Sequence, residues 1–199
     1  MKIIPAIAGL FLALVVTGTL QAQKIKVIEG SVDAFKSDNS VNFEFTYDSM
    51  KVGKYDKEED YVAQKQGDYN LKEPHKGDTW AKNWVDDRHY RFEPKFEELF
   101  LKYSEKTKSK DAKYTLIFKT TFTEPGYYFS GLPGAHKVAE IRGEVWIVES
   151  TNKNNVIAKL SVTDAIGRTA SGFADFDTGS RIAEAYADAG KALGKYLGK

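Results

Sequence analysis

The sequence AEIRGEVWIVESTNKNNVIAKLSV, residues 139–162, predicts two β-strands joined by a turn. Apolar and polar residues alternate in both halves, which is the period-two pattern of a strand with one buried face. The residues expected on the buried faces are Ala139, Ile141, Gly143, Val145 and Ile147, then Val156, Ala158, Leu160 and Val162. Because asparagine tolerates left-handed backbone dihedrals, the Asn-rich segment 151–155 is the expected turn of an antiparallel hairpin.

The same alternation predicts further strands upstream of this hairpin. A short strand is expected over residues 26–29, and a half-buried one over residues 41–47. A longer strand precedes the hairpin and places five residues on one face: Tyr114, Leu116, Phe118, Thr120 and Phe122. The strands together predict a sheet that needs an apolar cover on at least one face.

Two amphipathic helices can supply that cover. Pro94 suits the first turn of a helix, and apolar residues follow it at i, i+3, i+4 and i+7: Phe96, Leu99, Phe100 and Tyr103. A C-terminal helix over residues 180–197 carries a longer apolar stripe: Ile182, Tyr186, Ala189, Leu193 and Leu197. Small residues beside this stripe, including Gly190 and Gly194, permit a close backbone approach, and we expect that face to lie flat on the sheet.

The highly charged segment between residues 51 and 79 is expected to contain a short helix over residues 56–66. Residues 68–79 are predicted to form a loop, because Pro74 and Gly77 interrupt regular structure. Asp78 can then cap a following helix that carries Trp80 and Trp84 one turn apart.

Composition narrows the class of protein. The chain has 199 residues, 42% of them hydrophobic, and 29 basic against 28 acidic side chains, so neither disorder nor a general attraction to nucleic acid is indicated. It has no cysteine, which excludes disulfides, thiolate metal sites, cysteine nucleophiles and a lipid-modified cysteine. We expect one α+β domain over residues 23–199, an antiparallel or mixed sheet with helices mainly on one face and a C-terminal helix.

Residues 1–22 have the layout of a secretory signal peptide. A positive start at Lys2 is followed by an apolar run and then by small and polar residues that end at Ala22. The run is short for a membrane-spanning helix, which needs about 20 apolar residues. The sequence therefore predicts a periplasmic or secreted protein, with membrane attachment only if the signal stays uncleaved.

Catalytic motifs give little support to an enzyme. Residues 177–180 read Asp-Thr-Gly-Ser, as in the active-site loop of aspartic proteases, but those enzymes need two such aspartates and strands after the motif. Only 20 residues follow Gly179, and they are helical in pattern, so Asp177 or Thr178 is expected to cap the final helix. The histidines, His75, His89 and His136, show no metal-ligand spacing. No catalytic residue, metal or cofactor is predicted.

The segment between residues 124 and 136 is the candidate binding loop, because it is rich in proline and glycine and holds three consecutive aromatic residues. Loops on a rigid scaffold often carry function, and tyrosine anchors interfaces well. The partner-binding candidates are Tyr127, Tyr128, Phe129 and His136. The alternative is that these rings cover the edge of the sheet. Trp80 and Trp84 could stack on sugars, although aromatic residues at this helical spacing usually belong to a core.

Two segments carry a resemblance to a known group of proteins. They are Leu160-Ser161-Val162-Thr163-Asp164-Ala165-Ile166-Gly167 and the helix from Arg181 to Lys191. In these segments the chain resembles small, mostly uncharacterised bacterial envelope proteins. It is more remotely similar to the periplasmic domains of penicillin-binding-protein activators and curli-type secretion channels. The resemblance covers residues 113–197, concerns structure rather than catalysis, and implies a helix, a β-meander and a terminal helix.

The sequence thus favours an exported, non-catalytic bacterial envelope module that binds another envelope protein, with its oligomeric state left open. One alternative is a hydrolase with a site built from scattered carboxylates and histidines. Another is a small-ligand or glycan binder that uses Trp80 and Trp84.

Overall fold

A mixed sheet forms the centre of the computed structural model, which describes residues 24–128, 136–167 and 177–198. Within those ranges the sheet has seven strands, and six of them lie in the order β1-β9-β8-β5-β2-β4. Their bounds are β1 Lys24–Gly30, β9 Asn152–Gly167, β8 Ala139–Glu149, β5 Tyr114–Glu124, β2 Ser40–Thr46 and β4 Thr107–Lys108. The seventh, β3 (Lys51–Val52), pairs with β5. Strands β1, β9, β8 and β5 are antiparallel neighbours, whereas β2, β3 and β4 join in parallel.

The predicted β8–β9 hairpin is confirmed, but its turn is shorter than expected. Glu149 pairs with Asn152, so only Ser150 and Thr151 lie between the strands, and the asparagines extend β9. A register shift in β5 between Thr120 and Phe122 also reverses the alternation there. Thr123 is buried in place of Phe122, contrary to the predicted face. Such a bulge is invisible to a period-two pattern because it inserts one extra residue.

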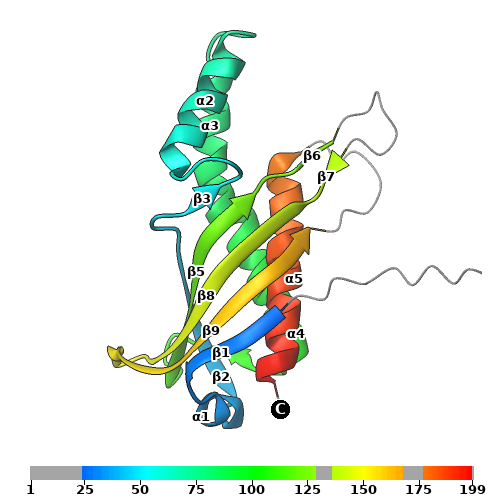
Figure 1. Cartoon of the computed structure of the whole chain (residues 1–199). Coiled ribbons are helices and arrows are strands. Elements are labelled where there is room, and N and C mark those ends of the chain that lie inside the picture. The colour runs from blue at the N-terminus through cyan, green and yellow to red at the C-terminus, as the bar shows by residue number, and fades with distance from the viewer. Residues whose placement is uncertain (1–23, 129–135, 168–176, 199) are drawn as a thin grey trace, which may run out of the picture.

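Helices α4 (Glu93–Ser104) and α5 (Thr178–Leu197) lie behind the sheet and cover one of its faces (Figure 1). The predicted stripe of α5 is buried over its whole length, from Ile182 to Leu197. The small residues beside it pack against α4 and not flat on the sheet, which corrects the sequence prediction. A Cβ on Gly190 would lie 2.2 Å from the carbonyl oxygen of Phe96, and one on Gly194 would lie 2.6 Å from that of Phe100.

A helical hairpin of α2 (Glu58–Asn70) and α3 (Lys76–Asp87) extends beyond the end of the sheet (Figure 1). The predicted loop over residues 68–79 is therefore too long, since the turn spans only residues 71–75. Asp78 does not cap α3, which begins at Lys76 with His75 as its N-cap. The carboxylate of Asp78 instead accepts hydrogen bonds from the side chains of Gln66 and Asn70, each at 2.9 Å. These bonds connect α3 to α2.

A π-helical turn, Arg88–Phe92, joins α3 directly to α4. The sequence predicts two separate helices here, but the structure continues as one long helix from Lys76 to Ser104. Single π-helical turns are rare and are frequently found at functional sites. The short helix α1 (Asp33–Ser37) links β1 to β2.

The fold class is confirmed as α+β with a mixed sheet and a C-terminal helix. The expected signal peptide, residues 1–22, lies outside the described residues. None of the helices in the described ranges combines the length and the hydrophobicity needed to cross a membrane.

Candidate functional site

Polar side chains meet at the π-helical turn, where the helical hairpin joins the body of the molecule. Glu58, on the first turn of α2, accepts hydrogen bonds from the Trp84 indole and the Arg88 guanidinium. The same guanidinium lies 4.3 Å from the centroid of the Tyr47 ring, a cation–π contact. Arg88 thus holds α2, α3 and the end of β2 together.

Two tyrosines, Tyr47 at the edge of the core and Tyr186 fully inside it, continue this polar network inward. The Tyr47 hydroxyl donates to Glu93 Oε1 at 3.2 Å, and the Tyr186 hydroxyl lies 2.6 Å from Thr120 Oγ1. Desolvation raises the pKa of Tyr47 and of Tyr186 far above the ordinary range, so both stay protonated at neutral pH. They serve as neutral hydrogen-bonding groups and not as proton-transfer groups.

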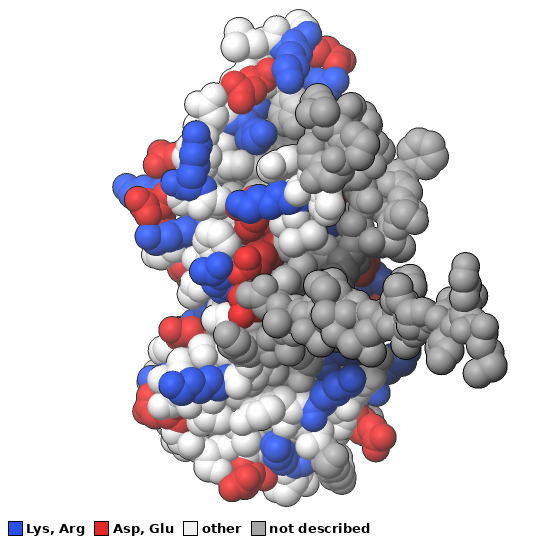
Figure 2. Space-filling view, turned by 45° about the vertical axis from the view of Figure 1, so that its right-hand side comes forward, with Lys and Arg blue, Asp and Glu red and all other residues white. Residues whose placement is uncertain are grey.

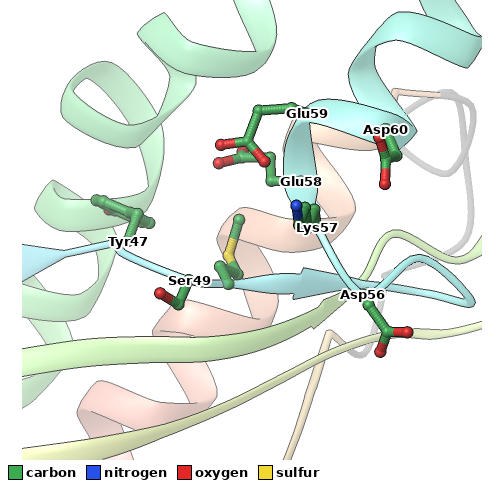
Figure 3. Close-up of a pocket in the computed structure, with 8 residues that line it drawn as sticks. Tyr47, Ser49, Asp56, Lys57, Glu58, Glu59 and Asp60 are labelled. Carbon is green, nitrogen blue, oxygen red and sulfur yellow. The ribbon is translucent and has the colours of Figure 1, made fainter.

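A hollow of about 620 Å³ opens beside this network (Figure 3). Tyr47, Ser49 and Met50 line one side, and residues 56–60 line the other. In Figure 3 the carboxylates of Glu58 and Glu59 extend toward Tyr47, whereas Asp56 points away from them. Asp56 pairs with Lys51 at 2.6 Å, and that hydrogen bond lowers its pKa. Glu58 is already engaged by Trp84 and Arg88, whereas Glu59 and Asp60 add two exposed carboxylates, so the hollow has an acidic rim.

The three histidines do not converge on a site. His75 lies 3.0 Å from Asp78, His89 lies 2.9 Å from Glu93, and His136 is exposed on another element, β7. In the part of the chain that the structure describes, no three His, Asp or Glu side chains are placed to hold a metal ion.

A second hollow, which we call the hairpin cleft, lies beside α2 and α3. It consists of two adjoining spaces of about 530 and 230 Å³ that share Tyr69, Trp80 and Asn83 as lining residues. Trp80 and Trp84 stack with ring centroids 5.6 Å apart. Trp84 is only 6% exposed, so the two indoles do not form the open platform that the glycan hypothesis requires. Trp84 belongs to the core, and Trp80 alone of the two is partly exposed.

The smaller space of the cleft ends at an Asp–Arg–Asp arrangement. Arg91 Nε lies 3.0 Å from Asp87 Oδ1, and Arg91 Nη1 donates to Asp177 Oδ1 at 2.9 Å. Asp177 Oδ1 also accepts the backbone N–H of Ser180 at 2.8 Å, which confirms that Asp177 caps α5. Residues 86 positions apart in sequence therefore meet here, which no local pattern could predict.

The two carboxylates differ in their pKa shifts. Burial raises the pKa of Asp87, and the charge of Arg91 only partly opposes this. Burial also acts to raise the pKa of Asp177, but the hydrogen bonds from Ser180 and Arg91 outweigh it, and the net shift is downward. Arg91 thus lies between a carboxylate that ionises readily and one that ionises reluctantly.

The lowered pKa of Asp177 predicts how stability depends on pH. The ionised carboxylate stabilises the fold at any pH above its unfolded-state pKa of about 3.9, and this contribution is lost as the pH falls through the lower folded-state pKa. Asn also caps helices well, so Asp177→Asn keeps the cap and removes the charge. We expect Asp177→Asn to melt below the wild type at pH 7, by a modest amount because the carboxylate is half-exposed. The difference should shrink as the pH falls below the unfolded-state pKa and through the lowered folded-state pKa of Asp177. A difference in melting temperature that stays the same as the pH is lowered would contradict this assignment.

The predicted binding loop is partly described. Its ends form a two-stranded ribbon in which β6 (Tyr127–Tyr128) pairs with β7 (His136–Lys137). Tyr127 is 55% exposed and His136 is also exposed, so neither covers the edge of the sheet. The side chain of Tyr128 and all of Phe129 lie outside the described residues.

The base of this ribbon is braced by α5. Arg181, which is buried, donates to the carbonyl oxygens of Pro125 at 3.2 Å and Gly126 at 3.3 Å. Gly126 has a positive φ of 65°, and a Cβ there would lie 2.4 Å from the carbonyl oxygen of Lys137. Arg181 is not among the functional residues predicted from the sequence. A charged residue directly beside the apolar stripe of α5 is nevertheless a local signal by which it could have been identified.

No protein-family model and no curated protein sequence matches the chain. Among solved structures, the chain is similar to the PelC dodecamer from Paraburkholderia phytofirmans, with a TM-score of 0.36 and 12% identity over 88% of this chain and 96% of that one. A single-substitution variant of the same dodecamer gives a TM-score of 0.32 and 11% identity over 83% and 96%. Structural similarities this distant give no information about function. Any functional proposal must therefore rest on the residues of this chain.

Proposed function

We propose that the protein is an exported, non-catalytic accessory module of the bacterial envelope that binds another envelope protein through its β6–β7 ribbon. The layout of residues 1–22 supports export. The observation that carries the proposal is an exposed aromatic side chain, Tyr127, presented on a ribbon whose base is fixed by the buried Arg181.

Rigid presentation favours binding. Arg181 reaches the ribbon from α5, and Lys137 pairs with Glu124 at 2.5 Å across its base. Little conformational freedom is then lost when a partner covers the tyrosine, and preorganisation of this kind increases affinity. Val138, which follows Lys137 in the chain, is 40% exposed and adds a second exposed apolar side chain to this end of the ribbon.

The charge distribution favours a protein partner over nucleic acid. Basic and acidic side chains are interspersed on the face seen in Figure 2, without a continuous basic stripe. Many basic side chains are already paired, as Lys153 is with Glu44 and Arg142 with Glu140. A phosphate backbone is bound by clustered and unpaired cations.

The proposal predicts that Tyr127→Ala weakens binding to the envelope partner roughly thirtyfold, as expected when an interface hot spot is removed. The partner is first isolated by crosslinking from envelope extract and identified, and its affinity for the purified protein is then measured. Tyr90→Ala is the matched control, because Tyr90 is also an exposed tyrosine, at 80%, but lies on the π-helical turn. If the two variants bind equally well while melting like the wild type, the ribbon is not the interface.

One observation favours the alternative of a hydrolase: the pKa values of Asp87 and Asp177 are shifted in opposite directions, as in acid–base pairs. Arg91 bonds to both carboxylates, and Asp177 is also the cap of α5, so a structural ion network accounts for the same shifts. A screen of hydrolase substrates with wild type and Asp87→Asn separates the two accounts. Turnover that disappears in Asp87→Asn would establish the enzyme.

A further inference from the structure

The hairpin cleft has the size and the lining of a ligand-binding site, and it is separate from the β6–β7 ribbon. Its two adjoining spaces, of about 530 and 230 Å³, together fall in the range of small-molecule pockets, roughly 300–1,000 Å³. Tyr69, Trp80 and Asn83 line both spaces, so the cleft is continuous along α3.

One wall of the cleft is aromatic. Trp80 lies between Tyr69, 5.7 Å away by ring centroid, and Trp84, 5.6 Å away. Trp84 and Tyr61 are buried and pack against Trp80 as well as against each other. The partly exposed indole is therefore held in place from within, and a fixed aromatic ring makes a good stacking surface.

Polar groups follow the indole along the same helix face. Asn83, Asp87 and Arg91 come three, seven and eleven residues after Trp80, and all of them line the smaller space. Asn83 is exposed, and its side-chain amide makes no hydrogen bond to another described residue. The amide can therefore donate and accept at once toward a ligand.

The charge of the cleft selects the ligand class. Arg91 is shared by two carboxylates, Asp87 and Asp177, so this end holds no excess positive charge to attract an anion. The cleft thus combines the indole of Trp80, the amide of Asn83 and the Arg91 guanidinium that is paired with two carboxylates. Such a combination suits a ligand with an apolar face and a rim of hydroxyl groups. A pyranose ring has that form, because its axial C–H groups can meet the negative face of an aromatic ring while its hydroxyl groups hydrogen-bond at the edge.

We propose that the hairpin cleft binds an uncharged oligosaccharide, with one pyranose ring on Trp80 and its hydroxyl groups on Asn83 and the Asp87–Arg91 pair. The site differs from the two-indole platform suggested by sequence, because Trp84 supports Trp80 from behind. It does not depend on the ribbon or on the identity of its partner.

Tryptophan fluorescence of the purified full chain tests this site directly. The protein has three tryptophans, and Trp146→Phe removes the one outside the cleft. This reporter variant is titrated with neutral cellotetraose, chitotetraose and maltotetraose, and with the anionic tetragalacturonate as the charged comparison. We expect saturable changes in emission with at least one neutral sugar and weaker changes with the uronate. No saturable response to any neutral sugar, or tighter binding of the uronate, would overturn the proposal.

Two substitutions locate the binding. Asn83→Ala should weaken it roughly three- to tenfold, the effect of losing one or two hydrogen bonds. Asn154→Ala is the matched control, since Asn154 is equally an exposed asparagine but lies on β9.

Trp80→Ala should abolish binding and Trp80→Phe should retain part of it. Should Trp80→Ala fail to fold, Asn83→Ala still decides, because equal affinities of the Asn83→Ala and Asn154→Ala variants would place the sugar elsewhere. Tyr127→Ala should leave sugar binding unchanged, which separates this test from that of the ribbon.

Discussion

Replacing Phe96 by alanine should lower the free energy of unfolding by about 3–5 kcal/mol. Phe96 is fully buried, and the centroid of its ring lies between 5.0 and 6.2 Å from those of Phe43, Phe45, Phe100 and Phe118. Those rings belong to β2, β5 and α4 itself, so this side chain joins the helix to two strands. Its removal takes away apolar burial and leaves a cavity that rigid aromatic neighbours fill only in part.

A loss of this size is a large share of the roughly 5–15 kcal/mol by which domains are stable. Urea denaturation followed by circular dichroism measures it, provided that the transition stays two-state. Leu99→Ala is the control, because Leu99 lies on the same helix but is only partly buried, and we expect a clearly smaller loss. If both variants lose the same stability, the Phe96 ring does not occupy the centre of the core.

The sequence predicts those parts of the fold that depend on local periodicity. The alternation around Leu116, Val145 and Leu160 reports which side of each strand is buried, and all three residues are fully buried. The stripe from Ile182 to Leu197 does the same for α5. These predictions succeed because the side-chain direction repeats every two residues in a strand and every 3.6 in a helix.

Features set by tertiary contacts could not be predicted in this way. The bulge before Phe122 and the π-helical turn at Arg88–Phe92 each shift the register without a local composition signal. Residues 68–79 are loop-like in composition because they contain Pro74 and Gly77, yet Asn70 and Asp78 bond across the turn and hold two helices together. The periodicity of apolar residues indicates which face of a strand or helix is buried. It does not indicate which other element covers that face.

The candidate sites show the same division. Tyr127 and His136 are candidates from the sequence because aromatic and polar residues in a Pro/Gly-rich segment are a local signal, and the structure shows that both are exposed. Their brace, Arg181, lies more than 50 residues away in sequence from the carbonyl groups that it holds. In the hairpin cleft, Trp80 is prominent in the sequence, but Arg91 acquires its role only where Asp177 meets it.

Gly190→Ala should destabilise the protein by about 1–3 kcal/mol, although alanine is the better helix former by about 1 kcal/mol. A Cβ at this position would lie 2.2 Å from the Phe96 carbonyl oxygen and 3.0 Å from its Cα. Backbone atoms of α4 cannot turn aside as a flexible side chain can, so α4 and α5 must move apart. That movement disturbs the packing around Phe92, which stacks on Tyr186 with ring centroids 5.2 Å apart.

Gly67→Ala provides the matched comparison, since Gly67 is also a glycine within a helix, α2. Apart from its chain neighbours and the backbone of its own helix, no atom of the described residues lies within 4 Å of the Cβ position. The same chemical change should there stabilise the protein by up to about 1 kcal/mol, because alanine reduces the backbone entropy lost on folding. Thermal unfolding of the two variants should therefore shift in opposite directions. Shifts of the same sign would mean that helix propensity governs both positions and that the α4–α5 contact is looser than the fold implies. Opposite shifts would assign the small residues of α5 to the helix–helix contact, where their size is what lets the two helices cover the sheet together.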